Sequence, residues 1–558
     1  MSDHPPALLP DRRSNRRVQA RAMRIAVAPM LLSWMLGAQL VWVAPAAAQE
    51  PDAAAAAAAP ESPGVEPGIQ YEDALAHEND RIAFEPGGRV TVGFRPRAGD
   101  GWEVNGRAPR ALPAGTASGR ELLGDGRAIV PRSVADDPSP SVDPSSGPDA
   151  SSAPDGYDVP STDPSATPDA DGASALLPSA DDPLALDGTR LRRQVFGFLP
   201  YWEVNDAVLD YEVLSTIAYF SVGSDKNGNL LKKNSDGSTT TGWAGWTSSR
   251  MTSIINAAHK KGTRVVLTIT MFAWTSGQAA AQGALLGSPT ARLNLAKQAA
   301  AAVRARGADG INLDFEPIAS GYADEFTAFV KTVRSELNKQ ASGYQLTFDT
   351  TGYIGNYPIE AATASGAADA VFIMGYDYRT SSSPSAGSID PLAGPAYDLA
   401  DTVNAFTSRV APSKVILGLP WYGRAWSTVS DAVNAKTQSG TKYGASAAVN
   451  YSTAVDYAAK YGRHWDSREL SSWIAFRREN CTTTYGCVTS WRQIYYDDPI
   501  AMKLRFDLIN RKGLRGAGIW ALGYDGSRTE LRQAIAEKFL NDRTAPLAGI
   551  RAMPATQT

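Results

Sequence analysis

Residues 309–317, Asp-Gly-Ile-Asn-Leu-Asp-Phe-Glu-Pro, combine acidic side chains with the alternation of a β-strand. Successive side chains of a strand point to opposite faces, so Asn312, Asp314 and Glu316 share one face and the apolar residues between them share the other. Carboxylates two residues apart are costly to bury unless they have a partner or a chemical task. At the end of an apolar strand, this pattern predicts acid chemistry in a cleft.

The elements that would position these side chains begin at about residue 193. From there, short apolar runs alternate with segments of helical periodicity, which is typical of parallel strands covered on both faces. Eight such units predict a (β/α)₈ TIM barrel. A doubly wound open sheet is the alternative, but the glycine-rich phosphate turn expected after an early strand is absent from the sequence. The eight predicted strands are 194–201, 216–222, 264–270, 310–316, 345–350, 370–376, 414–420 and 517–522.

The interval between the seventh and eighth predicted strands is too long for a simple loop and contains short aromatic strands such as 472–476. We therefore expect an α+β insertion at about 425–500. Cys481 and Cys487 lie in it, and two cysteines six apart in an exported chain favour one disulfide, with two buried free thiols as the alternative. The histidines and cysteines do not have metal-ligand spacing, so we expect no metal and no cofactor.

In a TIM barrel the active groups lie at the C-terminal ends of the strands. Those ends carry aromatic residues and carboxylates but few positive charges. Aromatic rings can stack on sugar rings, and carboxylates can bind hydroxyl groups and transfer protons. The set indicates a glycoside hydrolase and not a phosphate-ester enzyme, which would need cations. Its members are Tyr201, Trp202, Trp274, Asn312, Asp314, Glu316, Met374, Tyr376, Asp377, Trp421, Tyr422, Arg424 and Trp520.

The fourth predicted strand resembles the D-x-x-D-x-D-x-E signature of glycoside hydrolase family 18, the chitinase family. Asp309, Asp314 and Glu316 match this signature, and Asn312 is the one departure. The long insertion resembles a subdomain found in many members, and the resemblance covers about residues 194–541. Further motifs that resemble those of the family are Met-Gly-Tyr-Asp at 374–377, Gly-Leu-Pro-Trp-Tyr-Gly-Arg at 418–424 and Gly-Ile-Trp at 518–520.

The resemblance implies a retaining, substrate-assisted reaction on an N-acetylhexosamine polymer. In that reaction Glu316 protonates the glycosidic oxygen, and the substrate's own 2-acetamido carbonyl attacks the anomeric carbon. Asp314 orients the amide, while Tyr376 and Asp377 hold the acetamido group. The implied substrate-binding residues are Asn312, Tyr201, Trp202, Trp274, Met374, Trp421, Tyr422 and Trp520, and the implied supporting residues are Asp309 and Arg424.

Asn312 is expected to change the ionisation of the site. Two neighbouring carboxylates disfavour double ionisation, which raises one pKa. An asparagine can donate a hydrogen bond to Asp314 without adding charge. We therefore expect Asp314 to ionise more easily than in members with aspartate at this position, and Asn312→Asp to move the acidic limb of the pH–rate profile upward.

Three functions remain open at this level. Chitin or chitin oligomers, which are β-1,4-linked N-acetylglucosamine polymers, are the substrates that the resemblance favours. Peptidoglycan also contains N-acetylglucosamine and is the second candidate. A glycan-binding protein without catalysis is the third, but such relatives usually lose the acid that this chain keeps at Glu316. No nucleic acid is expected as a partner, because no basic stripe remains outside the N-terminus.

The first 48 residues are typical of a signal peptide. Arg16, Arg17, Arg21 and Arg24 precede an apolar run at 25–44, and three alanines precede Gln49 as a cleavage site. A retained membrane anchor is the alternative, and Met23 is an alternative start. We expect a secreted or cell-wall-associated monomer with no stable membrane span after cleavage.

Composition divides the chain between the signal peptide and the barrel. We expect residues 49–82 to be disordered and 83–132 to form a small β-rich segment of unknown role. Residues 133–189 hold twelve Asp and no Glu, Lys or Arg, so the rest of the chain carries about +8 although the net charge is −4. A segment this polar buries too little apolar surface to fold, and 133–192 is therefore expected to be a disordered linker. The catalytic barrel is expected at 193–545, followed by a tail at 546–558.

Overall fold

The structure is a computed structural model that describes residues 66–80, 82–88, 90, 191–438 and 440–540. The predicted signal peptide, the linker, the C-terminal tail and most of the expected β-rich segment lie outside these residues. The expected β-rich segment at 83–132 is therefore not tested beyond residues 83–88 and 90. All of the described residues belong to one compact unit.

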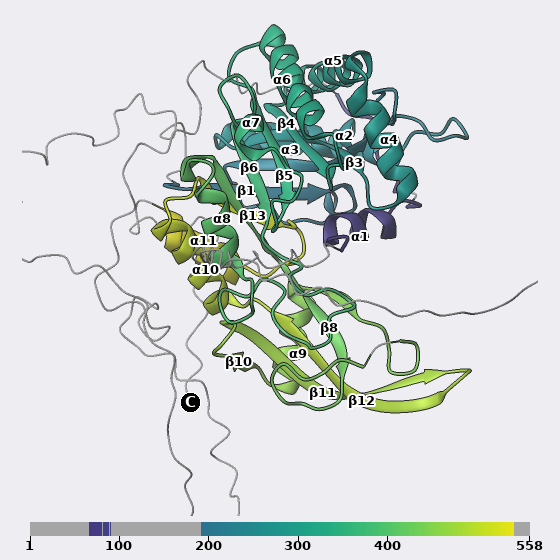
Figure 1. Cartoon of the computed structure of the whole chain (residues 1–558), viewed down its shortest axis with the longest axis vertical. Helices are drawn as coiled ribbons and strands as arrows, with labels where there is room; N and C mark the ends of the chain where they lie inside the picture. The colour runs from purple at the N-terminus through teal and green to yellow at the C-terminus, as the bar shows by residue number, and fades with distance from the viewer. Residues whose placement is uncertain (1–65, 81, 89, 91–190, 439, 541–558) are drawn as a thin grey trace, which may run out of the picture. The chain divides into compact units, whose positions relative to one another are not determined.

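Eight parallel strands close into a barrel in the order β1-β13-β7-β6-β5-β4-β3-β2 (Figure 1). The predicted TIM barrel is confirmed, and no predicted strand end differs from the observed one by more than two residues. Every residue of β4 is buried, as expected for a strand covered on both faces. The strands are β1 (Gln194–Pro200), β2 (Thr216–Gly223), β3 (Arg264–Phe272), β4 (Gly310–Glu316), β5 (Gln345–Thr351), β6 (Ala370–Met374), β7 (Val415–Pro420) and β13 (Gly516–Trp520).

Glycines in two of the motifs make room for the aromatic filling of the barrel. A Cβ added at Gly518 would lie 2.0 Å from the Phe372 ring, and one at Gly418 would lie 2.6 Å from the same ring. Phe372 packs in turn against Phe196 and Phe198, with ring centroids 5.6 and 5.0 Å away. The glycines are therefore needed for close packing inside the barrel.

Helices cover the outside of the barrel and begin at sequence signals that stabilise helix ends. A capping box between Thr275 and Gln278 opens α4 (Ser276–Gly287), and α5 (Pro289–Arg306) starts with proline and ends at Gly307 in the left-handed conformation. The other helices around the barrel are α2 (Thr241–Trp246), α3 (Ser249–Lys260), α6 (Ala323–Gln340), α7 (Ile359–Ala362), α8 (Leu399–Thr407), α10 (Pro499–Arg511) and α11 (Glu530–Phe539). In the part of the chain that the structure describes, no helix is both long and apolar enough to cross a membrane.

The insertion after the seventh barrel strand is an α+β unit, as predicted. Its five strands are ordered β10-β11-β12-β8-β9 and carry one helix, α9 (Tyr451–Tyr461). Its first strand starts at Tyr422, so Tyr422 and Arg424 belong to the insertion and not to the end of the barrel strand. The strands are β8 (Tyr422–Thr428), β9 (Ala447–Asn450), β10 (His464–Asp466), β11 (Ser471–Thr482) and β12 (Gly486–Tyr496).

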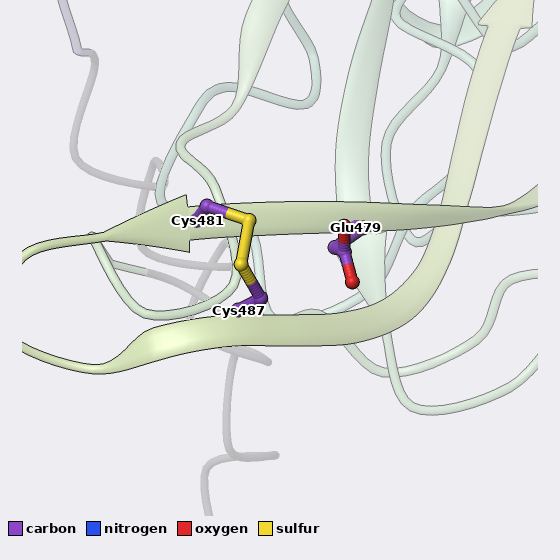
Figure 2. A group of neighbouring side chains, drawn as sticks. All are labelled: Glu479, Cys481 and Cys487. Carbon is purple, nitrogen blue, oxygen red and sulfur yellow. A yellow bond between two sulfur atoms is a disulfide. The ribbon is translucent and has the colours of Figure 1, made fainter.

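The predicted disulfide joins Cys481 and Cys487, which lie opposite each other near the tip of the β11–β12 hairpin (Figure 2). Glu479 lies beside the bond. The exposed side chains of Glu479, Cys481 and Cys487 are close enough together to hold a metal ion if the cysteines were free thiolates. Because the two sulfur atoms are bonded to each other, neither is available as a thiolate ligand. The bond closes the exposed end of a long hairpin.

Residues 69–76 form a helix, so the expectation of disorder across 49–82 is wrong for this stretch. The helix is α1 (Ile69–Ala76), and it lies against the barrel although more than a hundred residues separate it from β1 (Figure 1). Ile69 is 1% exposed and Tyr71 8% exposed, so packing against the barrel stabilises a helix too short to form alone. Sequence patterns alone do not report such a contact.

After α1 the chain runs along the corner between α2 and α3. Pro86 forms a bridge with Ser248, the Gly87 N–H donates to the Thr247 carbonyl at 2.9 Å, and the Ser249 N–H donates to the Glu85 carbonyl at 3.0 Å. This backbone pairing fixes the segment on the barrel.

Candidate active site

Four of the predicted site residues line a cavity of about 230 Å³ at the C-terminal end of the barrel. Glu316 is the last residue of β4 and Met374 the last of β6, and Tyr376 and Asp377 follow after Gly375. Tyr378, next to Asp377, also lines the cavity, together with residues that sequence reasoning did not select: Glu66, Gly68, Thr351, Gly352, Tyr353, Thr380, Ser382, Ser383 and Pro384.

Glu316 has the environment of a general acid. Its side chain is 1% exposed, and one carboxyl oxygen accepts a hydrogen bond from Trp274 Nε1 at 3.2 Å. The other oxygen makes no hydrogen bond to any described residue. Burial, followed by the negative charge of Asp314, raises the pKa of Glu316 well above its usual value. The group therefore holds its proton more tightly than an exposed glutamate and has an oxygen available for a substrate.

Asp314 lies beside a second carboxylate that the sequence analysis missed, Asp349 of β5. Asn312 Nδ2 donates to Asp349 Oδ2 at 2.7 Å, and Asn312 Oδ1 accepts from Thr347 Oγ1 at 2.6 Å. The expectation that Asn312 bonds to Asp314 is therefore wrong. Asn312 and Asp314 project from the same face of β4. The Asn312 side chain nevertheless bonds to two residues of the neighbouring strand β5 and not to Asp314.

Asp314 is harder to ionise than an exposed aspartate, and the expected difference from members with aspartate at position 312 stays a prediction. Burial and the charge of Asp349 raise the pKa of Asp314 well above its usual value, and burial raises the pKa of Asp349 as well. Each buried carboxyl disfavours ionisation of the other. With Asn312 present, the site still contains a carboxyl pair, formed by Asp314 of β4 and Asp349 of β5.

Both oxygens of Asp314 are buried and make no hydrogen bond within the described part of the chain. Buried carboxylate oxygens nearly always have a partner, so this pair indicates a ligand or a proton in the working state. A substrate amide N–H fits that requirement.

Asn312→Asp should still move the acidic limb of the kcat/KM–pH profile upward, by about one unit or more. The new carboxylate would replace the donor that now stabilises the Asp349 anion at 2.7 Å, so the whole group would bind its protons more tightly. Thr347→Val is the matched control, because it removes the other hydrogen bond of Asn312 without adding charge. An acidic limb at the same pH in wild type and in Asn312→Asp would contradict this explanation.

Asp377 is held from the opposite side of the cleft. Its backbone is in the left-handed region with φ of 59°, an uncommon conformation for this residue type. Tyr422 OH donates to its Oδ1 at 2.7 Å. Burial raises the pKa of Asp377 to about 6, and the positive charge of Arg424 opposes this rise. The hydroxyl of Tyr376 is buried and has no hydrogen-bond partner among the described residues.

The aromatic residues expected to contact sugar are present at the strand ends but are covered. Trp520 is fully buried, and its Nε1 donates to Asp73 of α1 at 3.1 Å. Trp202 stacks on His77 with ring centroids 4.2 Å apart, and Tyr201 OH donates to the His77 carbonyl. Trp421 is 2% exposed and follows β7.

Asp309 lies at the other end of β4 from Glu316. Its Oδ2 accepts the Val265 N–H at 2.7 Å and lies 2.8 Å from His259 Nε2. These buried contacts join α3 and β3 to the start of β4 and fit the supporting role expected for Asp309. Arg424 pairs with Glu72 of α1 at 2.7 Å and is not among the cavity-lining residues.

Two parts of the site were not found from the sequence. Asp349 carries the same signal as the opening strand, because Gln345, Thr347 and Asp349 alternate with Leu346 and Phe348 towards a strand end. The contribution of residues 66–77 has no comparable signal, since it depends on contacts between distant parts of the chain.

The fold and the site together define a class: a TIM-barrel protein whose cleft combines a buried carboxyl of raised pKa, a pair of aspartates and aromatic rings, as in glycoside hydrolases. The family model of glycosyl hydrolases family 18 matches residues 194–525, which is more than half of the chain. The chain therefore belongs to glycosyl hydrolases family 18.

Curated relatives are distant. The chain is 26% identical over 249 residues to the Bacillus subtilis (strain 168) protein named "Putative sporulation-specific glycosylase YdhD", covering 43% of this chain and 52% of that protein. It is 25% identical over 274 residues to mouse di-N-acetylchitobiase, covering 47% of this chain and 71% of the relative. The chain thus spans about half the length of the Bacillus relative.

Solved structures support the fold. A class V chitinase from Nicotiana tobaccum aligns with a TM-score of 0.51 at 18% identity, covering 62% of this chain and 98% of that one. A chitinase-like agglutinin from Robinia pseudoacacia aligns with a TM-score of 0.51 at 20% identity, with the same coverage. At this identity the likeness establishes the barrel but not the activity.

Proposed function

We propose that this protein is an exported, retaining glycosidase that cleaves β-1,4-linked N-acetylglucosamine polymers by substrate-assisted catalysis. The observation that carries the proposal is the arrangement around Glu316. A buried carboxyl with a raised pKa lies next to Asp314, whose two buried oxygens make no hydrogen bond to any described residue. An acid whose pKa is raised and a carboxylate ready for an amide are the two groups that this reaction needs.

In the proposed reaction Glu316 gives its proton to the glycosidic oxygen as the bond to the anomeric carbon breaks. The carbonyl oxygen of the substrate's 2-acetamido group attacks that carbon, and Asp314 accepts a hydrogen bond from the amide N–H. Tyr376 and Asp377 hold the acetamido group from the opposite side. Water then opens the oxazolinium ion, with Glu316 as the base, so the anomeric configuration is retained.

The geometry fits these roles without further groups. Trp274 holds one oxygen of Glu316 at 3.2 Å, which leaves the other for proton transfer. Tyr422 holds one oxygen of Asp377 at 2.7 Å, and the other oxygen, which the proposed reaction assigns to the substrate, accepts the Ile69 N–H at 2.7 Å. The Tyr376 hydroxyl is free to donate to the acetamido carbonyl, because it has no partner in the described structure.

Two observations keep other functions in view. Similarity to a Bacillus protein whose name describes a sporulation-specific glycosylase makes peptidoglycan the second candidate substrate. Similarity in fold to a plant agglutinin keeps glycan binding without catalysis as a third. Retention of Glu316 with a raised pKa favours catalysis over binding alone.

Product analysis distinguishes the three functions. The full chain would be incubated with N-acetylglucosamine hexamer and, separately, with purified peptidoglycan, and the soluble products identified by mass spectrometry. We expect shorter N-acetylglucosamine oligomers from the hexamer. Fragments from peptidoglycan alone would support the second candidate, and binding of the hexamer without products from either substrate would support the third.

A further inference from the structure

The N-terminus of α1 points directly at a carboxylate of the proposed active site. The Ile69 N–H donates to Asp377 Oδ2 at 2.7 Å. Gly68 provides no side-chain cap for α1, so Asp377 supplies the oxygen that the free amides of the helix end require. This oxygen is the one that Tyr422 leaves free for substrate.

Gly68 lies between Asp377 and Glu316, two carboxyls of the proposed reaction. A Cβ added to it would be 3.3 Å from Asp377 Oδ2 and 3.9 Å from Glu316 Oε2. A sugar ring bound for cleavage has to approach the same two carboxyls. The backbone at Gly68 and the sugar therefore require the same space.

Asp73, one turn further along α1, binds the indole of Trp520, a residue that the family resemblance assigns to substrate binding. Its Oδ2 accepts from Trp520 Nε1 at 3.1 Å and from Tyr524 OH at 2.6 Å. Trp520 is fully buried in this arrangement. The Nε1 edge of the indole is therefore engaged by α1 while the segment is docked.

Contacts on both sides of α1 extend this coverage along the cleft. The Tyr71 ring meets Phe272 edge-on, with centroids 5.1 Å apart, and lies 6.3 Å from the Trp274 ring. At the far end His77 stacks on Trp202. Glu72 pairs with Arg424 at 2.7 Å. The cavity that remains, about 230 Å³, is below the roughly 300–1,000 Å³ of most ligand pockets.

We propose that residues 66–77 are an autoinhibitory segment that occupies the acetamido-sugar site and has to leave before a glycan chain can bind. The proposal rests on the proposed function for the identity of the site. It follows from direct competition, because the segment uses Asp377 Oδ2, the space beside Glu316 and the Nε1 edge of Trp520.

Release of the segment requires the loss of little apolar burial, and the residues that follow it keep it near the cleft. Only Ile69, Gln70 and Tyr71 of α1 are buried, so its release exposes little apolar surface. The residues that follow stay paired with the α2–α3 corner, and Arg306 Nη1 donates to the Gly88 carbonyl at 3.0 Å. A tether this short keeps the segment at a high effective concentration near the cleft.

Gln70 gives an independent sign that the docked segment is not an optimal core element. Its side chain is fully buried, yet neither polar atom has a hydrogen-bond partner among the described residues. An unsatisfied buried amide costs free energy that release would recover.

A different role for α1 would be to form part of the substrate site. In that case disrupting α1 would weaken glycan binding, whereas autoinhibition predicts that disruption strengthens it. The two roles therefore give opposite signs in one measurement.

The test uses the full chain and the variant Asp73→Ala, which removes the acceptor for Trp520 and Tyr524 without touching the proposed catalytic groups. Asp73→Asn keeps an oxygen acceptor and should stay inhibited. Glu78→Ala is the matched control, because Glu78 is exposed and its carboxylate accepts a hydrogen bond from neighbouring Asn79. Unchanged thermal melting of all three variants would show that the barrel is intact.

Binding of N-acetylglucosamine hexamer would be measured by calorimetry. Each protein would also carry the substitution Glu316→Gln, so that the hexamer is not cleaved during the measurement. We expect Asp73→Ala to bind about tenfold tighter, equivalent to 1.4 kcal/mol, since the apparent Kd falls as the open fraction rises. With Glu316 intact, KM should fall by the same factor while kcat stays within about twofold. Asp73→Asn and Glu78→Ala should match wild type.

Equal or weaker binding by Asp73→Ala would overturn the autoinhibition proposal. Hydrogen exchange adds a second criterion: hexamer should speed exchange of the α1 amides in the Glu316→Gln protein, and slower or unchanged exchange would contradict displacement. Tighter binding with no turnover in any variant would reject the proposed function and keep the inference. Turnover with unchanged binding would do the reverse.

Discussion

Replacing Glu316 with glutamine is expected to lower kcat on N-acetylglucosamine oligomers by about 10²–10⁴-fold. Glutamine has nearly the same shape but cannot give a proton to the glycosidic oxygen or take one from water. The present side chain is buried, has a raised pKa and is held by Trp274, so it retains its proton to higher pH than an exposed glutamate does. Oligomer turnover would be measured by product release at saturating substrate.

Two controls make the Glu316→Gln result specific. Glu336→Gln changes another buried glutamate, on α6, that pairs with Lys339 away from the cleft, and should leave kcat unchanged. Hexamer affinity should be nearly equal in Glu316→Gln and wild type, because binding does not depend on the proton. A Glu316→Gln protein with more than a tenth of wild-type kcat would show that another group is the acid.

Asp314→Asn is expected to lower kcat by about 10²–10³-fold, the usual cost of removing a group aimed at charge in the transition state. The positive oxazolinium that forms from the acetamido group is stabilised by a carboxylate but not by an amide. Because both Asp314 oxygens make no hydrogen bond within the described structure, the loss should fall on kcat more than on thermal stability. Steady-state kinetics and a melting curve would separate these effects.

Asp349→Asn is the informative partner of Asp314→Asn. The Asp349 charge contributes to the raised pKa of Asp314, so removing that charge lets Asp314 ionise at lower pH. The acidic limb of the pH–rate profile should then move down, in the opposite direction to Asn312→Asp. An upward shift in Asp349→Asn, or a kcat loss larger than that of Asp314→Asn, would mean that the roles of the two aspartates are reversed.

The barrel was predictable because each strand carries its own signal. Buried parallel strands appear as apolar runs, and the eight runs fixed both the number of strands and the position of the insertion. The cleft residues followed from a general rule, that barrel chemistry lies at the strand ends, combined with the acidic alternation of β4. Glu316, Asp314, Tyr376 and Asp377 all lie at that end of the barrel, where the residues and the resemblance predicted them.

What escaped prediction depends on contacts between strands or between distant segments. The partner of Asn312 is set by the register of β4 against β5, which pairs Asn312 with Thr347 and brings Asp349 within reach. No single strand reveals that register. The docking of α1 is further removed from sequence patterns, since its Ile69 and Tyr71 form too small an apolar face to indicate burial. The helix α1 is stabilised by its contacts with the cleft that it covers.

The anomeric form of the first product tests the central claim most directly. Proton NMR would follow hydrolysis of N-acetylglucosamine hexamer by the full chain, before mutarotation mixes the anomers. Substrate-assisted catalysis predicts that the new reducing end appears in the β form and that fully de-acetylated oligomers are not cleaved. A first product in the α form, or equal cleavage of de-acetylated oligomers, would contradict the assignment of Glu316 and Asp314 to this reaction.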